Sequence, residues 1–145
     1  YCTACAAGKF AGDTGLTYCT QCAVGTYASA AGASVCDDCA AGKITASTGL
    51  TACSECAAGK YAATLGSSVC SKCVAGKYSP ATGTQHCTSC ALYDEGERNP
   101  FYWTNETGST ECAACACNDQ HGSAVESCDT STGTCTCTGQ WFDST

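Results

Sequence analysis

The feature that most constrains this chain is a pair of cysteines, separated by two other positions, that recurs at every seventeenth position. Six pairs keep this spacing, and a seventh follows later than the spacing predicts, as if a short segment had been inserted before it. The pairs are Cys2/Cys5, Cys19/Cys22, Cys36/Cys39, Cys53/Cys56, Cys70/Cys73, Cys87/Cys90 and Cys112/Cys115. A fixed period of this kind is typical of repeat architectures, in which each unit buries its surface against its neighbours.

Three other positions keep the same register. A glycine lies three residues after the second cysteine of a pair, another lies ten residues after it, and a bulky apolar residue stands between them. The first glycines are Gly8, Gly25, Gly42, Gly59 and Gly76; the second are Gly15, Gly32, Gly49, Gly66 and Gly83; the bulky residues are Phe10, Tyr27, Ile44, Tyr61 and Tyr78. Paired glycines predict two tight turns, either with φ > 0 or where the backbone passes close to a disulfide, and the four to six residues between turns fit short strands. We therefore expect a small disulfide-rich fold, an elongated and largely irregular ladder of short β-hairpin-like repeats over residues 1–90.

Cysteine makes up 18 of the 145 residues, whereas methionine is absent and only three Phe and two Trp are present. Chains with few core-forming side chains are stapled by disulfides, which persist in oxidising compartments, so we predict an extracellular location, secreted or on the cell surface. The net charge of −7 without a basic stripe argues against nucleic-acid binding. No apolar run approaches a membrane span. Because the chain opens at Tyr1, we expect its targeting sequence to lie elsewhere.

The pairing that best suits a translational repeat joins the second cysteine of one pair to the first of the next. It predicts one loop per repeat, each of about 15 residues and worth about 3 kcal/mol. The predicted disulfides join Cys5 to Cys19, Cys22 to Cys36, Cys39 to Cys53, Cys56 to Cys70, Cys73 to Cys87 and Cys90 to Cys112. Cys2 then has no partner within this sequence. A second scheme, which joins the first cysteine of one pair to the second of the next, such as Cys2 to Cys22, remains open.

The stretch from Cys56 to Cys90, CAAGKYAATLGSSVCSKCVAGKYSPATGTQHCTSC, carries the full pattern. It resembles the ephrin-receptor-like cysteine-rich repeat, a relative of the tumour-necrosis-factor-receptor modules. The resemblance covers about residues 1–115 and supports the fold class. It leaves the function open, because similar repeats occur in receptor ectodomains, adhesion proteins, protist surface antigens and the proteins of flagellar hairs.

From Cys115 onward the spacing changes to C-x-C-x10-C-x6-C-x-C. Residues 115–145 resemble an incomplete laminin-type EGF-like module. The resemblance implies that Cys115 pairs with Cys128 and Cys117 with Cys135, and that Cys137 pairs with a cysteine further downstream.

Residues 91–114 form an irregular last repeat with an aromatic insertion. Counting back from Gly108 puts Trp103 in the position of the bulky residue, so the inserted residues lie near 92–100. Two roles are open for the aromatic residues. They form a buried cap on the ladder, or Phe101, Tyr102 and Trp103 form a docking interface, since exposed aromatics are typical interface anchors.

Two further surface features bear on function. An N-glycosylation sequon begins at Asn105, and the many loop Ser and Thr residues are candidates for O-linked sugars. Lysine recurs at one repeat position, in Lys9, Lys43, Lys60 and Lys77. These lysines form either a line of positive charge that faces acidic residues of a neighbour, or a solvated edge.

Catalytic and metal-binding alternatives fit the sequence poorly. A zinc site would need two CxxC pairs and would double the repeat period, and the sequence shows no such doubling. A redox CxxC needs a helix. His86 and His121 lie in dissimilar contexts, and the doublet of Asp37 and Asp38 has no counterpart in other repeats. We predict that the chain is not an enzyme and holds no metal or cofactor.

Two classes of function remain, that of a structural protein and that of a binding protein. The first hypothesis is a self-associating structural subunit of an extracellular filament, flagellar hair (mastigoneme) or surface coat, which repeats of nearly identical small residues favour. The second is the ectodomain stalk or ligand-binding region of a cell-surface receptor, adhesion protein or protist surface antigen. The partners would be other copies, other extracellular proteins or glycans.

Overall fold

The computed structural model describes residues 4–13, 17–90, 102–114, 127–128 and 135–136. Within these ranges the secondary structure consists of two-residue strands paired into antiparallel hairpins, without a helix. The strands are β1 (Lys9–Phe10), β2 (Thr20–Gln21), β3 (Thr26–Tyr27), β4 (Asp37–Asp38), β5 (Lys43–Ile44), β6 (Ser54–Glu55), β7 (Lys60–Tyr61), β8 (Ser71–Lys72), β9 (Lys77–Tyr78), β10 (Thr88–Ser89), β11 (Tyr102–Trp103), β12 (Ala113–Ala114), β13 (Ser127–Cys128) and β14 (Cys135–Thr136). This is the disulfide-rich, largely irregular fold that the sequence predicts.

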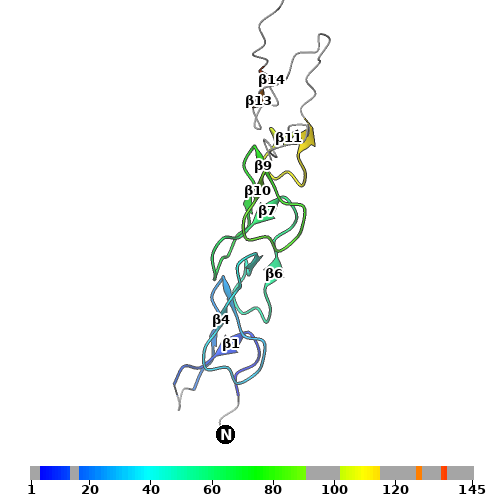
Figure 1. Cartoon of the computed structure of the whole chain (residues 1–145). Helices are drawn as coiled ribbons and strands as arrows, with labels where there is room; N and C mark the ends of the chain where they lie inside the picture. Colours follow the sequence, from blue (N-terminus) through cyan, green and yellow to red (C-terminus); the bar gives the residue numbers. More distant parts are fainter. Residues whose placement is uncertain (1–3, 14–16, 91–101, 115–126, 129–134, 137–145) are drawn as a thin grey trace, which may run out of the picture.

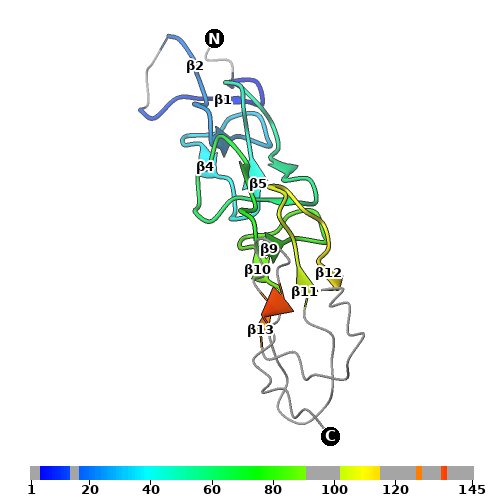
Figure 2. The ribbon, with the colours of Figure 1, turned by 90° about the horizontal axis from the view of Figure 1, so that it is seen from above.

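Each repeat contributes one hairpin, and six hairpins follow one another along an elongated ladder (Figures 1 and 2). We number the repeats one to six from the second cysteine of each pair, so that they begin at Cys5, Cys22, Cys39, Cys56, Cys73 and Cys90. The first strand follows the first glycine turn, and the second strand is the two residues between paired cysteines. The strands are shorter than the expected four to six residues because a glycine turn and the disulfide-bonded cysteines bound them.

Six disulfides close one loop in each repeat, and they follow the first of the two pairing schemes. They are Cys5–Cys19, Cys22–Cys36, Cys39–Cys53, Cys56–Cys70, Cys73–Cys87 and Cys90–Cys112. The first five span a sequence separation of 14, and the sixth spans a separation of 22. The repeats are therefore closed one by one rather than cross-linked to each other.

The core is a narrow column of sulfur and small side chains, which we call the cystine column. Cys22, Cys39, Cys56 and Cys73 are fully buried, and Cys5 and Cys90 nearly so. Small residues share this interior at one repeat position, namely Ala28, Thr45, Ala62, Ser79 and Thr104. The bulky residues beside them, such as Tyr27 and Tyr61, are only half-buried. A core this thin cannot by itself offset the entropy of ordering the chain, which explains the need for one disulfide per repeat.

Backbone hydrogen bonds join each repeat to the next. The Gly25 N–H donates to the Thr45 carbonyl at 3.0 Å, and the Gly49 N–H donates to the Cys22 carbonyl at 2.8 Å. The first kind of bond recurs as Gly8 to Ala28, Gly42 to Ala62, Gly59 to Ser79 and Gly76 to Thr104; the second recurs as Gly32 to Cys5, Gly66 to Cys39, Gly83 to Cys56 and Gly108 to Cys73. Because these contacts use only main-chain atoms, they tolerate changes in the exposed side chains.

The glycine turns also bring together repeats that are two steps apart. Gly42, with φ of 85°, lies so close to Gly83 that an added β-carbon would sit 1.9 Å from the Gly83 carbonyl oxygen. Gly8 and Gly49, Gly25 and Gly66, and Gly59 and Gly108 make the same approach. The ladder is thus more compact than a stack in which each repeat contacts only its immediate neighbours.

The last repeat keeps this geometry despite its longer loop. Trp103 lies opposite Ala113 in the hairpin of β11 and β12, as Tyr78 lies opposite Thr88 in the preceding repeat. Gly108, with φ of 82°, takes the place of the second glycine. The predicted position of Trp103 is therefore confirmed, and the inserted residues up to residue 101 lie outside the described part of the chain.

Candidate interaction surface

In each hairpin the first residue of the first strand lies opposite the second residue of the second strand. We call these residue pairs the hairpin edge. In repeats one to five these pairs are Lys9/Gln21, Thr26/Asp38, Lys43/Glu55, Lys60/Lys72 and Lys77/Ser89. All five second-strand members are exposed. The charge of the pairs changes along the ladder. The first pair is basic, the second is acidic, the third is an ion pair, the fourth is doubly basic and the fifth is basic. The hairpin edge is therefore the variable part of an otherwise repetitive molecule.

In the third repeat the two hairpin-edge residues, Lys43 and Glu55, neutralise each other's charge. The Lys43 Nζ lies 3.3 Å from the Glu55 Oε1, and the Thr82 hydroxyl donates to the Glu55 Oε2 at 2.8 Å. The hydrogen bond from Thr82, followed by the bond and charge of Lys43, holds the pKa of Glu55 below its ordinary value. Thr82 belongs to the fifth repeat, so the Glu55 carboxylate connects two repeats that are two steps apart. Such exposed contacts contribute little stability individually.

Side chains at the position of Glu55 reach across to the second glycine turn in other repeats as well. The Thr48 hydroxyl donates to the Gln21 Oε1 at 3.0 Å, in the same arrangement as Thr82 and Glu55. The aliphatic part of Lys72 lies against Gly108, with its Cδ 3.5 Å from where a β-carbon of Gly108 would be. This position of the hairpin edge therefore packs on the repeat two steps further along.

The four recurring lysines are not equivalent, in contrast to the uniform line that their spacing suggests. Lys43 is paired with Glu55, whereas Lys60 faces a second lysine, Lys72, across the hairpin of β7 and β8. Lys77 is exposed and faces Ser89. Like charges directly opposite each other in a hairpin are destabilising, so the fourth repeat carries an uncompensated positive site.

Apolar side chains are also exposed along the ladder. Tyr18, Val35 and Val69, each of which directly precedes a cysteine, have exposed fractions of 67%, 64% and 68%. Leu65 is 67% exposed in the same loop as Val69. Single exposed apolar residues are normal on protein surfaces, so these residues do not by themselves define a contact surface.

The sequon lies in an exposed turn after β11. Asn105 and Thr107 are both exposed, and the turn is closed by the Ser109 hydroxyl, which donates to the Glu106 carbonyl at 2.9 Å. An open polar hollow of about 400 Å³ adjoins it, lined by Thr104, Asn105, Glu106, Gly108, Ser109, Thr110, Glu111 and Ala113. The acceptor asparagine is thus accessible, and its glycosylation stays a prediction.

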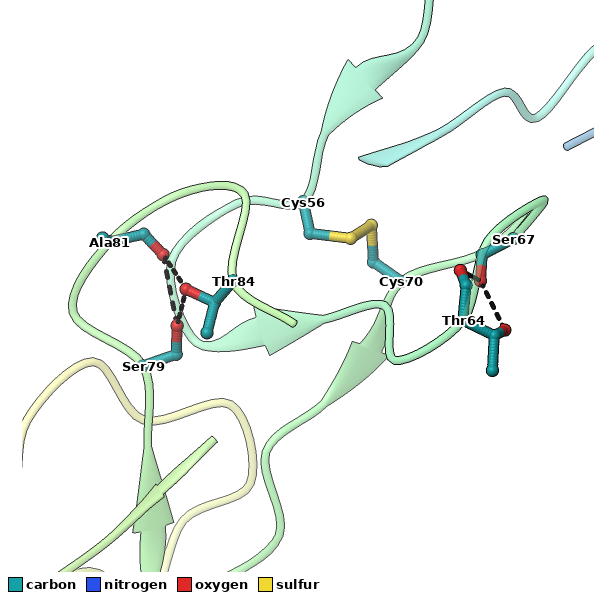
Figure 3. Close-up of a disulfide and its surroundings, with 7 residues drawn as sticks. All are labelled: Cys56, Thr64, Ser67, Cys70, Ser79, Ala81 and Thr84. Carbon is teal, nitrogen blue, oxygen red and sulfur yellow. Dashed lines mark hydrogen bonds between the residues drawn. A yellow bond between two sulfur atoms is a disulfide. The ribbon is translucent and has the colours of Figure 1, made fainter. Parts of the chain in front are cut away.

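Hydroxyl groups in the loops differ in what they contact (Figure 3). The buried Ser79 hydroxyl lies 2.7 Å from the Thr84 Oγ1, and the Thr84 hydroxyl donates to the Ala81 carbonyl at 3.0 Å. Thr64 and Ser67 bond to each other at 3.1 Å on the exposed side of the fourth loop. These hydroxyls close turns, and only the exposed ones are accessible for O-linked sugars.

The remaining predicted site residues fall into two groups. Phe101, His121, Cys2, Cys115, Cys117 and Cys137 lie outside the described residues. Tyr102 and Trp103 are described as strand β11, and Cys128 lies opposite Cys135 in the hairpin of β13 and β14. The docking role of the aromatic residues and the EGF-like disulfides therefore stay predictions.

The cysteines between residues 5 and 112 are joined in disulfides, and a disulfide sulfur is not the thiolate that zinc or redox chemistry needs. His86 is exposed beside Cys87, and Asp37 and Asp38 form the exposed strand β4. Among the described residues no group of three His, Cys, Asp or Glu side chains is arranged to hold a metal ion.

The ladder of disulfide-closed hairpins defines an elongated cysteine-rich repeat protein. A family model described as tyrosine-protein kinase ephrin type A/B receptor-like matches residues 8–56, about a third of the chain. No curated protein matches the sequence. The matched segment holds the same hairpin, glycine turns and disulfide that recur up to Cys112. Disulfide-stapled repeats of this receptor-like kind indicate an extracellular or cell-surface region, structural or receptor-like, and are typically non-enzymatic. Within the described ranges, no helix could cross a membrane.

Proposed function

We propose that the chain is a structural subunit of an extracellular filament, flagellar hair (mastigoneme) or surface coat. The observation that carries this proposal is the use of the second glycine turns. Gly49, Gly66 and Gly83 each lie against a glycine and a hairpin-edge side chain two repeats earlier. A binding module keeps such loop tips free to contact a ligand. In this chain the loop tips pack against the repeat two steps earlier, which favours a regular and stiff rod.

The disulfides support the same role. Each closed loop of about 15 residues contributes about 3 kcal/mol by restricting the unfolded chain. Since every repeat has its own disulfide, a locally opened repeat remains covalently closed independently of its neighbours. A part that bears mechanical stress outside the cell benefits from this independence.

A second candidate is the ectodomain stalk or ligand-binding region of a cell-surface receptor, adhesion protein or protist surface antigen. The match of residues 8–56 to a receptor-like family model favours it. A stiff ladder would serve such a protein as a spacer. The partners would then be other extracellular proteins or glycans rather than further copies.

Immunogold electron microscopy of native, non-reduced material separates the two functions. The antibody is raised against the whole purified chain, and antibody absorbed with that chain is the control. Label at regular intervals along hairs, filaments or a coat is the expected result. Label on separate molecules scattered over the cell membrane would reject the structural subunit and support the receptor.

Glycosylation of Asn105 is part of the proposal, because the sequon is exposed. We expect the peptide that contains Asn105 to carry an N-linked glycan in native material, and to lose that mass after enzymatic removal of N-glycans. The Asn105→Gln variant is the control and should show no such mass change. Native peptide that carries no glycan would contradict the prediction.

A further inference from the structure

Charge is segregated along the hairpin edge, and this segregation indicates how copies would pack. Residues 57–90 contain three lysines, Lys60, Lys72 and Lys77, and no aspartate or glutamate. Two repeats earlier, Asp37 and Asp38 form strand β4 and face Thr26 and Tyr27. The edge therefore has a basic segment in the fourth and fifth repeats and an acidic segment in the second.

Neither segment is neutralised within the described residues. The ion pair found there joins Lys43 to Glu55 in the third repeat, between the two segments. Lys72 is exposed and faces Lys60, so each lysine raises the cost of the other's charge. Asp37 and Asp38 are exposed as well. A contact between the basic segment of one copy and the acidic segment of another would compensate the charge of both segments.

The two segments occupy corresponding places in the repeat. Asp38 and Lys72 are the second residues of strands β4 and β8, which belong to the second and fourth repeats. A second copy aligned in register would place basic repeats beside basic repeats. A shift of two repeats instead places the basic segment of one copy beside the acidic segment of its neighbour. Charge complementarity of this kind sets register and suppresses wrong pairings.

We propose that neighbouring copies of this chain associate laterally and in parallel with a stagger of two repeats, so that Lys60 and Lys72 of one copy face Asp38 of the next. The inference rests on the proposed structural function. Since the two contacting surfaces differ, the association is heterologous and each copy still offers one free surface of each kind. Between parallel copies, repetition of the contact gives an open filament, whereas an antiparallel pair would satisfy both segments at once in a closed dimer; assembly that stops at such a dimer would overturn the proposal.

Charge complementation tests the stagger in the full-length, oxidised chain. The variant Lys60→Glu/Lys72→Glu and the variant Asp37→Lys/Asp38→Lys should each need at least tenfold more protein to assemble than the wild type. A mixture of the two should assemble at wild-type concentration, because acidic and basic segments are again available to each other. The variant Lys43→Glu/Glu55→Lys keeps an internal ion pair and should behave as the wild type. Unchanged assembly of the first two variants would overturn the proposal.

Cross-linking locates the contact directly. A carbodiimide joins carboxylates to amines that are in contact, and a mixture of isotope-labelled and unlabelled chains distinguishes links between copies from links within one copy. We expect mixed-isotope links from Lys60 or Lys72 to Asp38. Mixed-isotope links only to Glu106 or Glu111 would overturn the stagger, since they require a shift in the other direction.

The controls also separate this inference from the proposed function. If the wild type forms filaments and the charge variants form them equally well, the stagger is wrong and the structural role stands. A wild-type chain that forms no filaments at any ionic strength would reject the structural role itself. If the lysine variants assemble normally but lose binding to a sulfated polysaccharide column, the basic segment binds a polyanion and the stagger is wrong.

Discussion

The cystine column and the hairpin edge lie a few residues apart in every repeat, yet they follow different rules. In the column a buried cysteine recurs from repeat to repeat, with Cys22, Cys39, Cys56 and Cys73 all fully buried. On the edge the facing pairs change from Thr26/Asp38 to Lys60/Lys72 over two repeats. The interior is constrained by close packing, whereas the exterior is free to vary in charge.

This difference indicates where function is encoded. Substitutions in the cystine column should reduce the free energy of unfolding, and substitutions on the hairpin edge should change assembly with little effect on that free energy. Matched variants in the two regions test this separation.

The largest effect is expected for Gly42→Ala. The new β-carbon would lie 1.9 Å from the Gly83 carbonyl oxygen, at a residue whose φ is 85°. Strain and overpacking together should lower the free energy of unfolding by about 4 kcal/mol. Urea denaturation of the oxidised chain measures the loss.

Two matched substitutions separate the causes. Gly32→Ala has the same kind of φ, 80°, but only an ordinary 3.7 Å contact with Ala4, so it should cost about 1–2 kcal/mol. In Gly12→Ala the new β-carbon makes only ordinary contacts, the nearest at 3.9 Å from the Ser34 carbonyl oxygen, and stability should change by less than about 1 kcal/mol. If Gly42→Ala cost no more than Gly32→Ala, the contact between repeats two steps apart would be wrong.

Removal of one disulfide should have the next largest effect. The double variant Cys56→Ala/Cys70→Ala opens a loop of about 15 residues and should lower the free energy of unfolding by about 3 kcal/mol. Lys72→Gln, which changes the neighbouring hairpin edge, should cost less than about 0.5 kcal/mol. Equal losses in the two variants would show that column and edge are not separate.

A buried hydroxyl should matter more than an exposed one. Thr45 is 1% exposed and its hydroxyl donates to the Thr26 carbonyl at 3.2 Å. Thr45→Val should cost about 1 kcal/mol, because that carbonyl loses its side-chain donor. Thr48→Val removes the exposed bond to Gln21 and should stay within about 0.5 kcal/mol. A larger loss for Thr48→Val than for Thr45→Val, in thermal or urea unfolding, would contradict this order.

The smallest effect concerns Glu55. Its pKa is lower in the folded chain than in the unfolded chain, so its contribution to stability is present above the unfolded pKa and disappears as the pH falls through the folded pKa. Titration followed by NMR should give a Glu55 pKa below the ordinary glutamate value. Thr82→Val should raise this pKa, since the Thr82 hydrogen bond is the largest cause of the shift, and Thr48→Val should leave it unchanged. An ordinary pKa in the wild type would remove Glu55 as a link between repeats.

The period of the cysteine pairs was sufficient to predict much of the fold. It led to the pairing of Cys39 with Cys53, to positive φ at Gly42 and Gly49, and to the place of Trp103 in the last hairpin. Each of these is a property of one repeat and its attachment to the next, which a translational pattern expresses directly.

The contacts between repeats two steps apart could not be predicted in this way. Gly42 and Gly83 lie far apart in the sequence, and their approach depends on how each repeat turns relative to the last, which a linear period does not specify. The same holds for Thr82 and Glu55, and hence for the neutralised charge of Lys43. The recurrence of glycine at both turn positions was the available signal, since glycine is needed where two backbones meet.

The cystine column requires one disulfide within each repeat, and a tryptic digest of native, non-reduced and alkylated protein tests this pairing. Trypsin cuts after Lys72, between the loops closed by Cys56–Cys70 and Cys73–Cys87, and the structure joins no cysteine before this point to one after it within residues 5–112. The predicted result is two separate disulfide-linked groups of peptides, one with the cysteines from Cys5 to Cys70 and one with Cys73, Cys87, Cys90 and Cys112. A linkage of Cys53 to Cys73, or of Cys70 to Cys90, would keep the groups together and contradict the cystine column.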